Sequence, residues 1–255
     1  MATVIRGHAD SPPPRRLKIE AVVTSVGMAD FLAHTLPMNI GHFDRYVVVT
    51  APEDRDTQRV ARYWGATCVL TDAFRSRWGE FCKGTGLNDG LAICDRTDWL
   101  SHMDVDIAQP PVFRRYIEEA SLDKSMIYGC DRAEFKSYRD WQRYIGNPAL
   151  HTDGGASCFI DPQHHGRRLG TRLHFGHAGG YITLGFLQLW NVASGITEYK
   201  QGHTDAARED NEFAMRWPRA KRGFLPEIIV YHLESEDAPM AVNWKGRKTK
   251  PFQHE

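Results

Sequence analysis

The first 72 residues alternate between short apolar runs and amphipathic segments, and this alternation restricts the fold more than any other feature. Three runs rich in β-branched and apolar residues predict buried strands at 17–24, 46–50 and 67–71. The segments between them, 29–40 and 54–64, carry apolar residues at helical spacing, and Gly65 suits a helix C-terminal cap. Strand, helix, strand, helix, strand in this order predicts a parallel sheet with crossover helices.

The remaining chain continues this alternation. Further helices are expected at 86–94, 110–120 and 204–217, and further strands at 99–103, 126–130, 157–160 and 223–230. Residues 131–180 are less periodic and rich in Gly and His, which indicates loops around a site. Without a repeat or a linker, residues 17–255 are expected to form one α/β domain that ends in a polar tail. Its sheet should be mixed, mainly parallel and flanked by helices, and residues 1–16, with three consecutive prolines, should be a flexible segment.

The charge balance and the cysteines narrow the function classes. Lys plus Arg and Asp plus Glu both number 32, and this balance argues against non-specific adhesion to nucleic acid or anionic membranes. The five cysteines are scattered without a Cys-x-x-Cys pair, which favours free thiols in a reducing compartment. Neither a signal-peptide pattern nor an apolar run of about 18 residues occurs, so a cytoplasmic protein without a transmembrane segment is predicted.

Two carboxylates follow the strand predicted at 99–103. Asp104 and Asp106 are separated by one residue, so in an extended segment both side chains point the same way. In open α/β sheets, ligands bind at the carboxyl ends of the strands. A pair of carboxylates at this edge suits Mg²⁺ or Mn²⁺, although it could also be a solvated acidic turn.

A second acidic pair, Glu209 and Asp210, lies near the start of the helix predicted at 204–217, where Thr204 or Asp205 could be the N-cap. Acidic residues here can simply complement the helix dipole. They can also supply a general base that takes a proton from an acceptor hydroxyl.

Two further segments carry groups that can bind a ligand. Residues 83–90 contain three glycines, which allow close approach of the backbone, and Lys83 and Asn88, which can donate hydrogen bonds to phosphate or sugar. This segment is not a Walker loop, since the Gly-Lys-Ser/Thr sequence is missing. His232 is expected just past the strand at 223–230, in a suitable place for a metal ligand, although such a histidine is more often structural.

The order of these features resembles the GT-A family of nucleotide-sugar-dependent glycosyltransferases, over about residues 17–250. The most specific parts are the Asp104-Val-Asp106 turn after an apolar strand and the Glu209-Asp210 pair. The resemblance implies a GT-A-like, Rossmann-related fold, a divalent Mn²⁺ or Mg²⁺ ion and a nucleoside-diphosphate sugar as donor. It also implies a transferase that moves the sugar to an acceptor hydroxyl.

The resemblance also assigns roles to individual residues. It implies Asp210, or failing it Glu209, as the base of an inverting transfer. The implied donor contacts are Thr24, Asp72, Lys83, Asn88 and Asp104. The implied metal ligands are Asp104, Asp106 and His232, and Tyr181 and Trp190 would stack on the acceptor unless they are core residues. The family also contains retaining members, which do not need the base.

Several alternatives remain open at this stage. A sugar-nucleotide pyrophosphorylase shares the fold class, but the segment after the first strand lacks the basic, glycine-rich loop that it needs. A non-catalytic relative could bind a nucleotide or glycan without chemistry. The acceptor could be a glycan, a protein side chain or a hydroxylated base of modified DNA, for which the basic residues in 167–172 and 245–250 would be useful.

Overall fold

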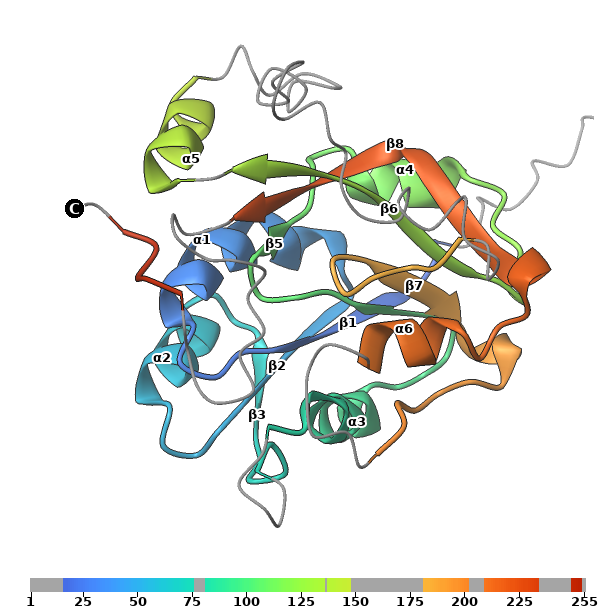
Figure 1. Cartoon of the computed structure of the whole chain (residues 1–255), viewed down its shortest axis with the longest axis horizontal. Helices are drawn as coiled ribbons and strands as arrows, with labels where there is room; N and C mark the ends of the chain where they lie inside the picture. The colour runs from blue at the N-terminus through green and yellow to red at the C-terminus, as the bar shows by residue number, and fades with distance from the viewer. Residues whose placement is uncertain are drawn as a thin grey trace, which may run out of the picture.

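The computed structural model describes residues 16–75, 81–135, 137–147, 181–201, 209–233 and 249–253. In these residues one eight-stranded sheet runs through the molecule in the order β3-β2-β1-β4-β7-β6-β8-β5 (Figure 1). The strands are β1 (Ile19–Thr24), β2 (Arg45–Thr50), β3 (Thr67–Leu70), β4 (Trp99–His102), β5 (Ile107–Ala108), β6 (Ile127–Phe135), β7 (Gln188–Asn191) and β8 (Arg222–Leu233). The helices are α1 (Ala29–Asn39), α2 (Arg55–Tyr63), α3 (Lys83–Ile93), α4 (Phe113–Glu119), α5 (Tyr138–Ile145) and α6 (Glu209–Ala214).

The sheet is mixed, as predicted. The pairs β1–β2, β2–β3, β1–β4 and β6–β8 are parallel, whereas β4–β7, β6–β7 and β5–β8 are antiparallel. The parallel half contains the three strands predicted in the first 72 residues. Because β1 and β4 run in the same direction, the segments that follow them leave the sheet at the same edge.

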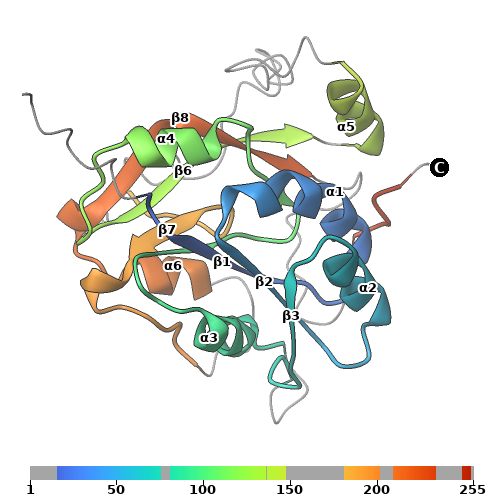
Figure 2. The ribbon, with the colours of Figure 1, turned by 180° about the vertical axis from the view of Figure 1, so that it is seen from behind.

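Apolar residues fill both faces of the sheet in two clusters. One cluster packs α1 and α4 against the sheet, and the other packs α3 and α6 against the opposite face. Accordingly, α6 lies in front of the sheet in Figure 1, and α1 and α4 lie in front when the molecule is turned in Figure 2. Alternate residues of a strand point to opposite faces. In β2, Val48 therefore joins the first cluster, and Val47 and Val49 join the second.

Local capping explains two of the helix boundaries. The Asp54 carboxylate accepts a hydrogen bond from the Thr57 backbone N–H at 3.1 Å and begins α2. The same helix ends before Gly65, whose φ of +77° is in the left-handed region that favours glycine, as the sequence indicated. Ser137 likewise accepts from the Asp140 N–H at 3.1 Å and begins α5.

The glycine-rich segment 83–90 is helical, and α3 begins three residues before the helix predicted at 86–94. It forms the first two turns of α3, and its glycines serve packing. A Cβ at Gly90 would lie 2.4 Å from Val22 Cγ1 and 2.6 Å from Val49 Cγ2, so only glycine lets α3 approach the sheet this closely. A Cβ at Gly86 would lie 2.2 Å from the ring of Phe74.

Other boundaries also differ from the predictions. Loops were expected over 131–180, but β6 continues to Phe135 and α5 follows it, and β7 was not predicted. His232 lies inside β8 rather than beyond it. At the end of the described chain, the buried Phe252 stacks on Phe31 with ring centroids 5.0 Å apart, where a polar tail was expected.

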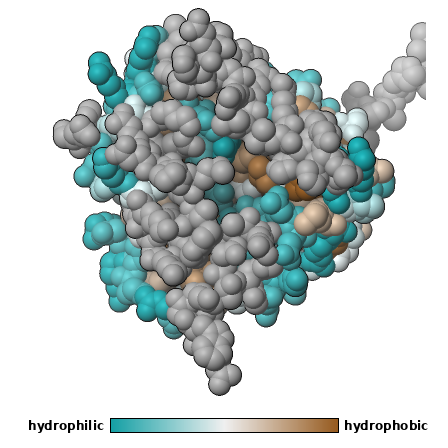
Figure 3. Space-filling view, viewed as in Figure 1, coloured by the Kyte–Doolittle hydropathy of each residue, from teal (hydrophilic) through white to brown (hydrophobic). Residues whose placement is uncertain are grey.

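The strand predicted at 157–160, the cap at 204–205 and the N-terminal segment up to residue 15 lie outside the described residues. None of the described helices has the length and apolar character needed to cross a bilayer. The coloured surface in Figure 3 is mostly hydrophilic, and apolar colour is confined to small areas of that face.

Candidate active site

The chain leaves β4 through the turn that carries both aspartates, and this turn is fastened on two sides. The backbone N–H of Asp104 donates to the Gly185 carbonyl at 2.7 Å. The carbonyl of Asp106 accepts from the Leu233 N–H at 2.9 Å, which joins the turn to β8. The two carboxylates therefore occupy fixed places at the edge of the sheet.

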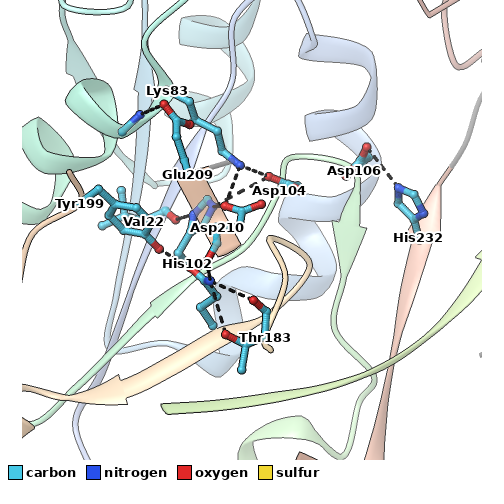
Figure 4. Close-up of polar contacts among 12 residues, drawn as sticks. Val22, Lys83, His102, Asp104, Asp106, Thr183, Tyr199, Glu209, Asp210 and His232 are labelled. Carbon is cyan, nitrogen blue, oxygen red and sulfur yellow. Dashed lines mark hydrogen bonds and ion pairs between the residues drawn. The ribbon is translucent and has the colours of Figure 1, made fainter. Parts of the chain in front are cut away.

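Asp106 and His232 form one part of the site. The register of β5 and β8 pairs Ile107 with His232, which brings the imidazole beside the residue before Ile107. Asp106 Oδ2 lies 3.4 Å from His232 Nε2, and both side chains are largely buried (Figure 4). Among the described residues, Asp106 Oδ1 is buried and has no hydrogen-bond partner.

Lys83, Asp104 and Asp210 form the other part, and they come from α3, the turn after β4, and α6 (Figure 4). The Lys83 ammonium lies 2.5 Å from Asp104 Oδ1 and 3.4 Å from Asp210 Oδ1. Its side chain is 8% exposed. Burial opposes the charged form, but the nearby carboxylates outweigh burial and raise the pKa of Lys83 above its ordinary value.

The two acids of α6 differ in protonation. Burial acts to raise the pKa of Asp210, but Lys83 and His102 outweigh it and hold this pKa below its usual range. In Glu209, burial prevails and raises the pKa to about 7. Its Oε1 accepts a hydrogen bond from the Gly84 N–H at 2.8 Å, at the start of α3. At neutral pH, Asp210 is thus ionised, whereas Glu209 is partly protonated and attaches α6 to α3.

His102 and Gly185 complete the cluster, and neither was predicted as a site residue from the sequence. His102 Nδ1 lies 3.1 Å from the Val22 carbonyl, and a carbonyl can only accept, so Nδ1 carries a proton. Its Nε2 lies 3.8 Å from Asp104 Oδ1 and 3.7 Å from Asp210 Oδ1. A Cβ at Gly185 would lie 2.3 Å from Asp210 Oδ2 and 2.6 Å from Asp104 Oδ2.

One signal could have identified His102. It is a histidine in a largely apolar strand, two residues before Asp104, and hence on the same side of an extended chain. Gly185 had no comparable signal, because its contact with the carboxylates depends on the tertiary fold.

The remaining predicted site residues are more dispersed. Thr24 ends β1 at the sheet edge where β4 also ends. Asp72, in contrast, follows β3, which is separated from β4 by two strands. The Asn88 side chain is engaged by the Tyr199 backbone, to which it donates at 2.9 Å and from which it accepts at 2.7 Å.

Of the two predicted acceptor aromatics, Trp190 is a core residue. It has no exposed surface and packs edge-on against Phe213, with ring centroids 4.9 Å apart. Tyr181 is 6% exposed and packs against Phe224. The four histidines of 164–177 lie outside the described residues, as do the arginines of 167–172.

The comparisons with known proteins concern the fold. No protein-family model matches the chain, and no curated protein sequence matches it. Among solved structures, the mannosyltransferase PcManGT from Pyrobaculum calidifontis, in complex with GDP-Man and Mn²⁺, is similar with a TM-score of 0.51 and 16% identity. The alignment covers 86% of this chain but 58% of the mannosyltransferase.

Glucosyl-3-phosphoglycerate synthase from Mycobacterium tuberculosis, in complex with phosphoglyceric acid, aligns with a TM-score of 0.49 and 14% identity. This alignment covers 88% of this chain and 74% of the synthase. The fold assignment rests on the mannosyltransferase. The chain has the GT-A glycosyltransferase fold, as its sequence predicted.

Proposed function

We propose that this protein is a metal-dependent glycosyltransferase that moves a sugar from a nucleoside-diphosphate sugar to an acceptor hydroxyl. The observation that carries the proposal is the convergence of two arrangements at one sheet edge. The Asp106–His232 pair suits a cation, and the Lys83–Asp104–Asp210 cluster, which shares the turn after β4 with this pair, contains an ionised carboxylate. The GT-A fold and the GDP-Man and Mn²⁺ named for the similar mannosyltransferase support this choice.

The Asp106–His232 pair fits Mn²⁺ or Mg²⁺ by its donor atoms. A carboxylate oxygen and an imidazole nitrogen 3.4 Å apart can bind one ion. Asp106 Oδ1 is a buried acceptor without a hydrogen-bond partner in the part of the chain that the structure describes, so it also has an oxygen to offer. No group of three His, Cys, Asp or Glu ligands occurs among the described residues. The remaining positions would be filled by donor phosphates and water. When bound, the ion neutralises charge that develops on the leaving diphosphate.

Lys83 and Asp104 serve the donor in this proposal. Two of the three N–H donors of the Lys83 ammonium face Asp104 and Asp210, and we assign the third to a donor phosphate oxygen. Asp104 is 38% exposed on its side chain, so its other oxygen can accept a hydrogen bond from ribose or sugar. Thr24 and Asp72, after β1 and β3, are proposed for the nucleoside.

Asp210 is the proposed base of an inverting transfer. A base must be unprotonated before the reaction, and the depressed pKa of Asp210 meets this condition at neutral pH. Glu209 meets this condition only in part, since its pKa is about 7, and its Oε1 is occupied by the Gly84 N–H. We therefore assign the base to Asp210 and a docking role to Glu209.

Tyr181 is the aromatic residue that we retain for the acceptor side of the site. We withdraw Trp190, because stacking on an acceptor would require a fully buried core residue to leave its packing. A glycan or protein hydroxyl is the main proposal. The second is a hydroxylated base of modified DNA.

The test is to incubate the protein with Mn²⁺ and a panel of sugar nucleotides, and to measure release of free nucleoside diphosphate with and without candidate acceptors, hydroxymethylated DNA included. One donor is expected to give Mn²⁺-dependent release that stops in Asp210→Asn and Asp106→Asn. Nucleotide binding without release from any donor would contradict the proposal and indicate a non-catalytic binding protein.

A further inference from the structure

The register of β4 and β7 places a glutamine beside the proposed base. Gln188 is directly opposite His102 in this antiparallel pair, and both side chains lie on the sheet face that α3 and α6 cover. Gln188 has no exposed surface. Its Nε2 donates to the backbone carbonyl of Asp210 at 2.8 Å and to the Thr183 carbonyl at 3.3 Å.

The orientation of this amide is unambiguous. Nε2 faces two carbonyl oxygens, which can only accept, so the opposite atom is Oε1. Oε1 accepts a hydrogen bond from the Tyr199 hydroxyl at 2.5 Å. Both ends of the Gln188 side chain are thus occupied by partners of the correct kind, and the amide has one arrangement.

Tyr199 is itself fixed to two helices. Its backbone forms the two hydrogen bonds with the Asn88 side chain on α3 described above. Its ring stacks on Phe213 of α6 with centroids 3.9 Å apart and planes inclined by 12°. Asn88, Tyr199 and Gln188 therefore form a continuous series of contacts from α3, through β7, to the backbone of Asp210. We call these three residues the strut.

We propose that Gln188, supported by Tyr199 and Asn88, is a positioning residue that fixes the backbone of Asp210 and so the place of its carboxylate against Lys83 and Asp104. Helices as short as α6, with six described residues, are marginal by themselves, so tertiary contacts decide where they lie. The catalytic consequence rests on the proposed function, in which Asp210 is the base.

The first test is kinetic and uses variants that keep the packing. Gln188→Met keeps the side-chain length and removes both polar ends of the amide. It is expected to lower kcat by about 10-fold to 100-fold, since a misplacement of about 1 Å can cost that much, and to leave the donor KM within about twofold. Tyr199→Phe keeps the stack on Phe213 but removes the hydroxyl, and a smaller fall in kcat is expected.

Asn191→Leu is the matched control. Asn191 is a buried amide on the same strand, and it hydrogen-bonds Asp98 at 2.8 Å and the Ala193 N–H at 2.9 Å, both away from the cluster. Its side chain points to the other sheet face, because it is an odd number of residues from Gln188. This variant should lose stability as well, but its kcat should equal that of the wild type.

The second test does not need activity. Hydrogen exchange of a peptide that covers α6 should be at least about 10-fold faster in Gln188→Met than in the wild type, but unchanged in Asn191→Leu. Faster α6 exchange together with a kcat-only loss supports the proposal. Unchanged α6 exchange, or a kcat that stays at the wild-type value, overturns it.

The two tests also separate this proposal from the proposed function. If the wild type transfers no sugar, the proposed function fails, and the exchange of α6 decides whether the strut fixes Asp210. If Gln188→Met does not fold, Tyr199→Phe is judged by the same two measurements.

Discussion

Glu209→Gln should make the protein more stable at neutral and higher pH. The wild-type carboxyl has a pKa of about 7 in the folded protein against an ordinary value of 4.5, because it is buried. At about 1.4 kcal/mol per pH unit, this rise amounts to about 3 kcal/mol. The folded state binds the proton more tightly than the unfolded state. Below pH 4.5 the Glu209 carboxyl therefore does not lower the free energy of unfolding. Above pH 4.5 it lowers this free energy by an amount that grows until pH passes 7.

The glutamine variant removes this cost and keeps an oxygen for the Gly84 N–H, which Glu209 Oε1 accepts at 2.8 Å. Urea unfolding of both proteins, followed by tryptophan fluorescence at intervals from pH 4.5 to 8.5, gives the difference in free energy of unfolding. That difference should be near zero at the lowest pH and rise to about 3 kcal/mol above pH 7.5. Glu212→Gln, on the same helix but 31% exposed, is the control for the removal of a carboxylate from α6. If the free energy of unfolding of Glu209→Gln and that of the wild type changed with pH in parallel, the reasoning would be refuted.

Three further substitutions test the other parts of the site. Asp106→Asn should abolish Mn²⁺-dependent transfer and leave the circular dichroism spectrum unchanged. Calorimetric titration with Mn²⁺ should show weaker binding than in the wild type. An unchanged Mn²⁺ affinity would remove the assignment of Asp106 as a metal ligand. Lys83→Met should lower the free energy of unfolding by about 3 kcal/mol at pH 7, because two carboxylates lose their buried counter-charge. Since Asp210 owes its depressed pKa to Lys83, this loss should shrink as pH falls below about 4 and the carboxylates protonate; a loss independent of pH would argue against the ion pairs. Gly185→Ala should lower transfer at least about 10-fold, since its Cβ would intrude between two carboxylates, and full activity would show that they move freely.

The parallel half of the fold was predictable because its signals are local. β1, β2 and β3 are short apolar runs, and α2 has both a capping aspartate and a terminal glycine. α3 was predicted only in part, because three glycines in eight residues indicate a loop unless the close approach of α3 to Val22 and Val49 is known. The antiparallel strand β7 had no such pattern, since both of its faces are covered and buried polar residues interrupt its apolar ones.

The candidate site was predictable where a residue lies next to a recognisable strand end. Asp104 and Asp106 follow β4 directly, and the structure brings Lys83, Asp104 and Asp210 together and Asp106 to His232. The parts of the site that depend on long-range contacts could not be predicted from the sequence. Asn88 looked like a ligand donor, but it holds Tyr199, 111 residues later in the chain. Gln188 gave no signal, because its contact with Asp210 exists only once β7 and α6 pack.

A crystal structure of the protein with Mn²⁺ and a nucleoside-diphosphate sugar analogue tests the central claim most directly. The ion is expected between Asp106 and His232, bound to both and to the diphosphate, with the Asp210 carboxylate facing the side of the sugar that an acceptor would attack. A nucleotide bound elsewhere, or an ion that leaves the 3.4 Å contact between Asp106 and His232 untouched, would contradict the account.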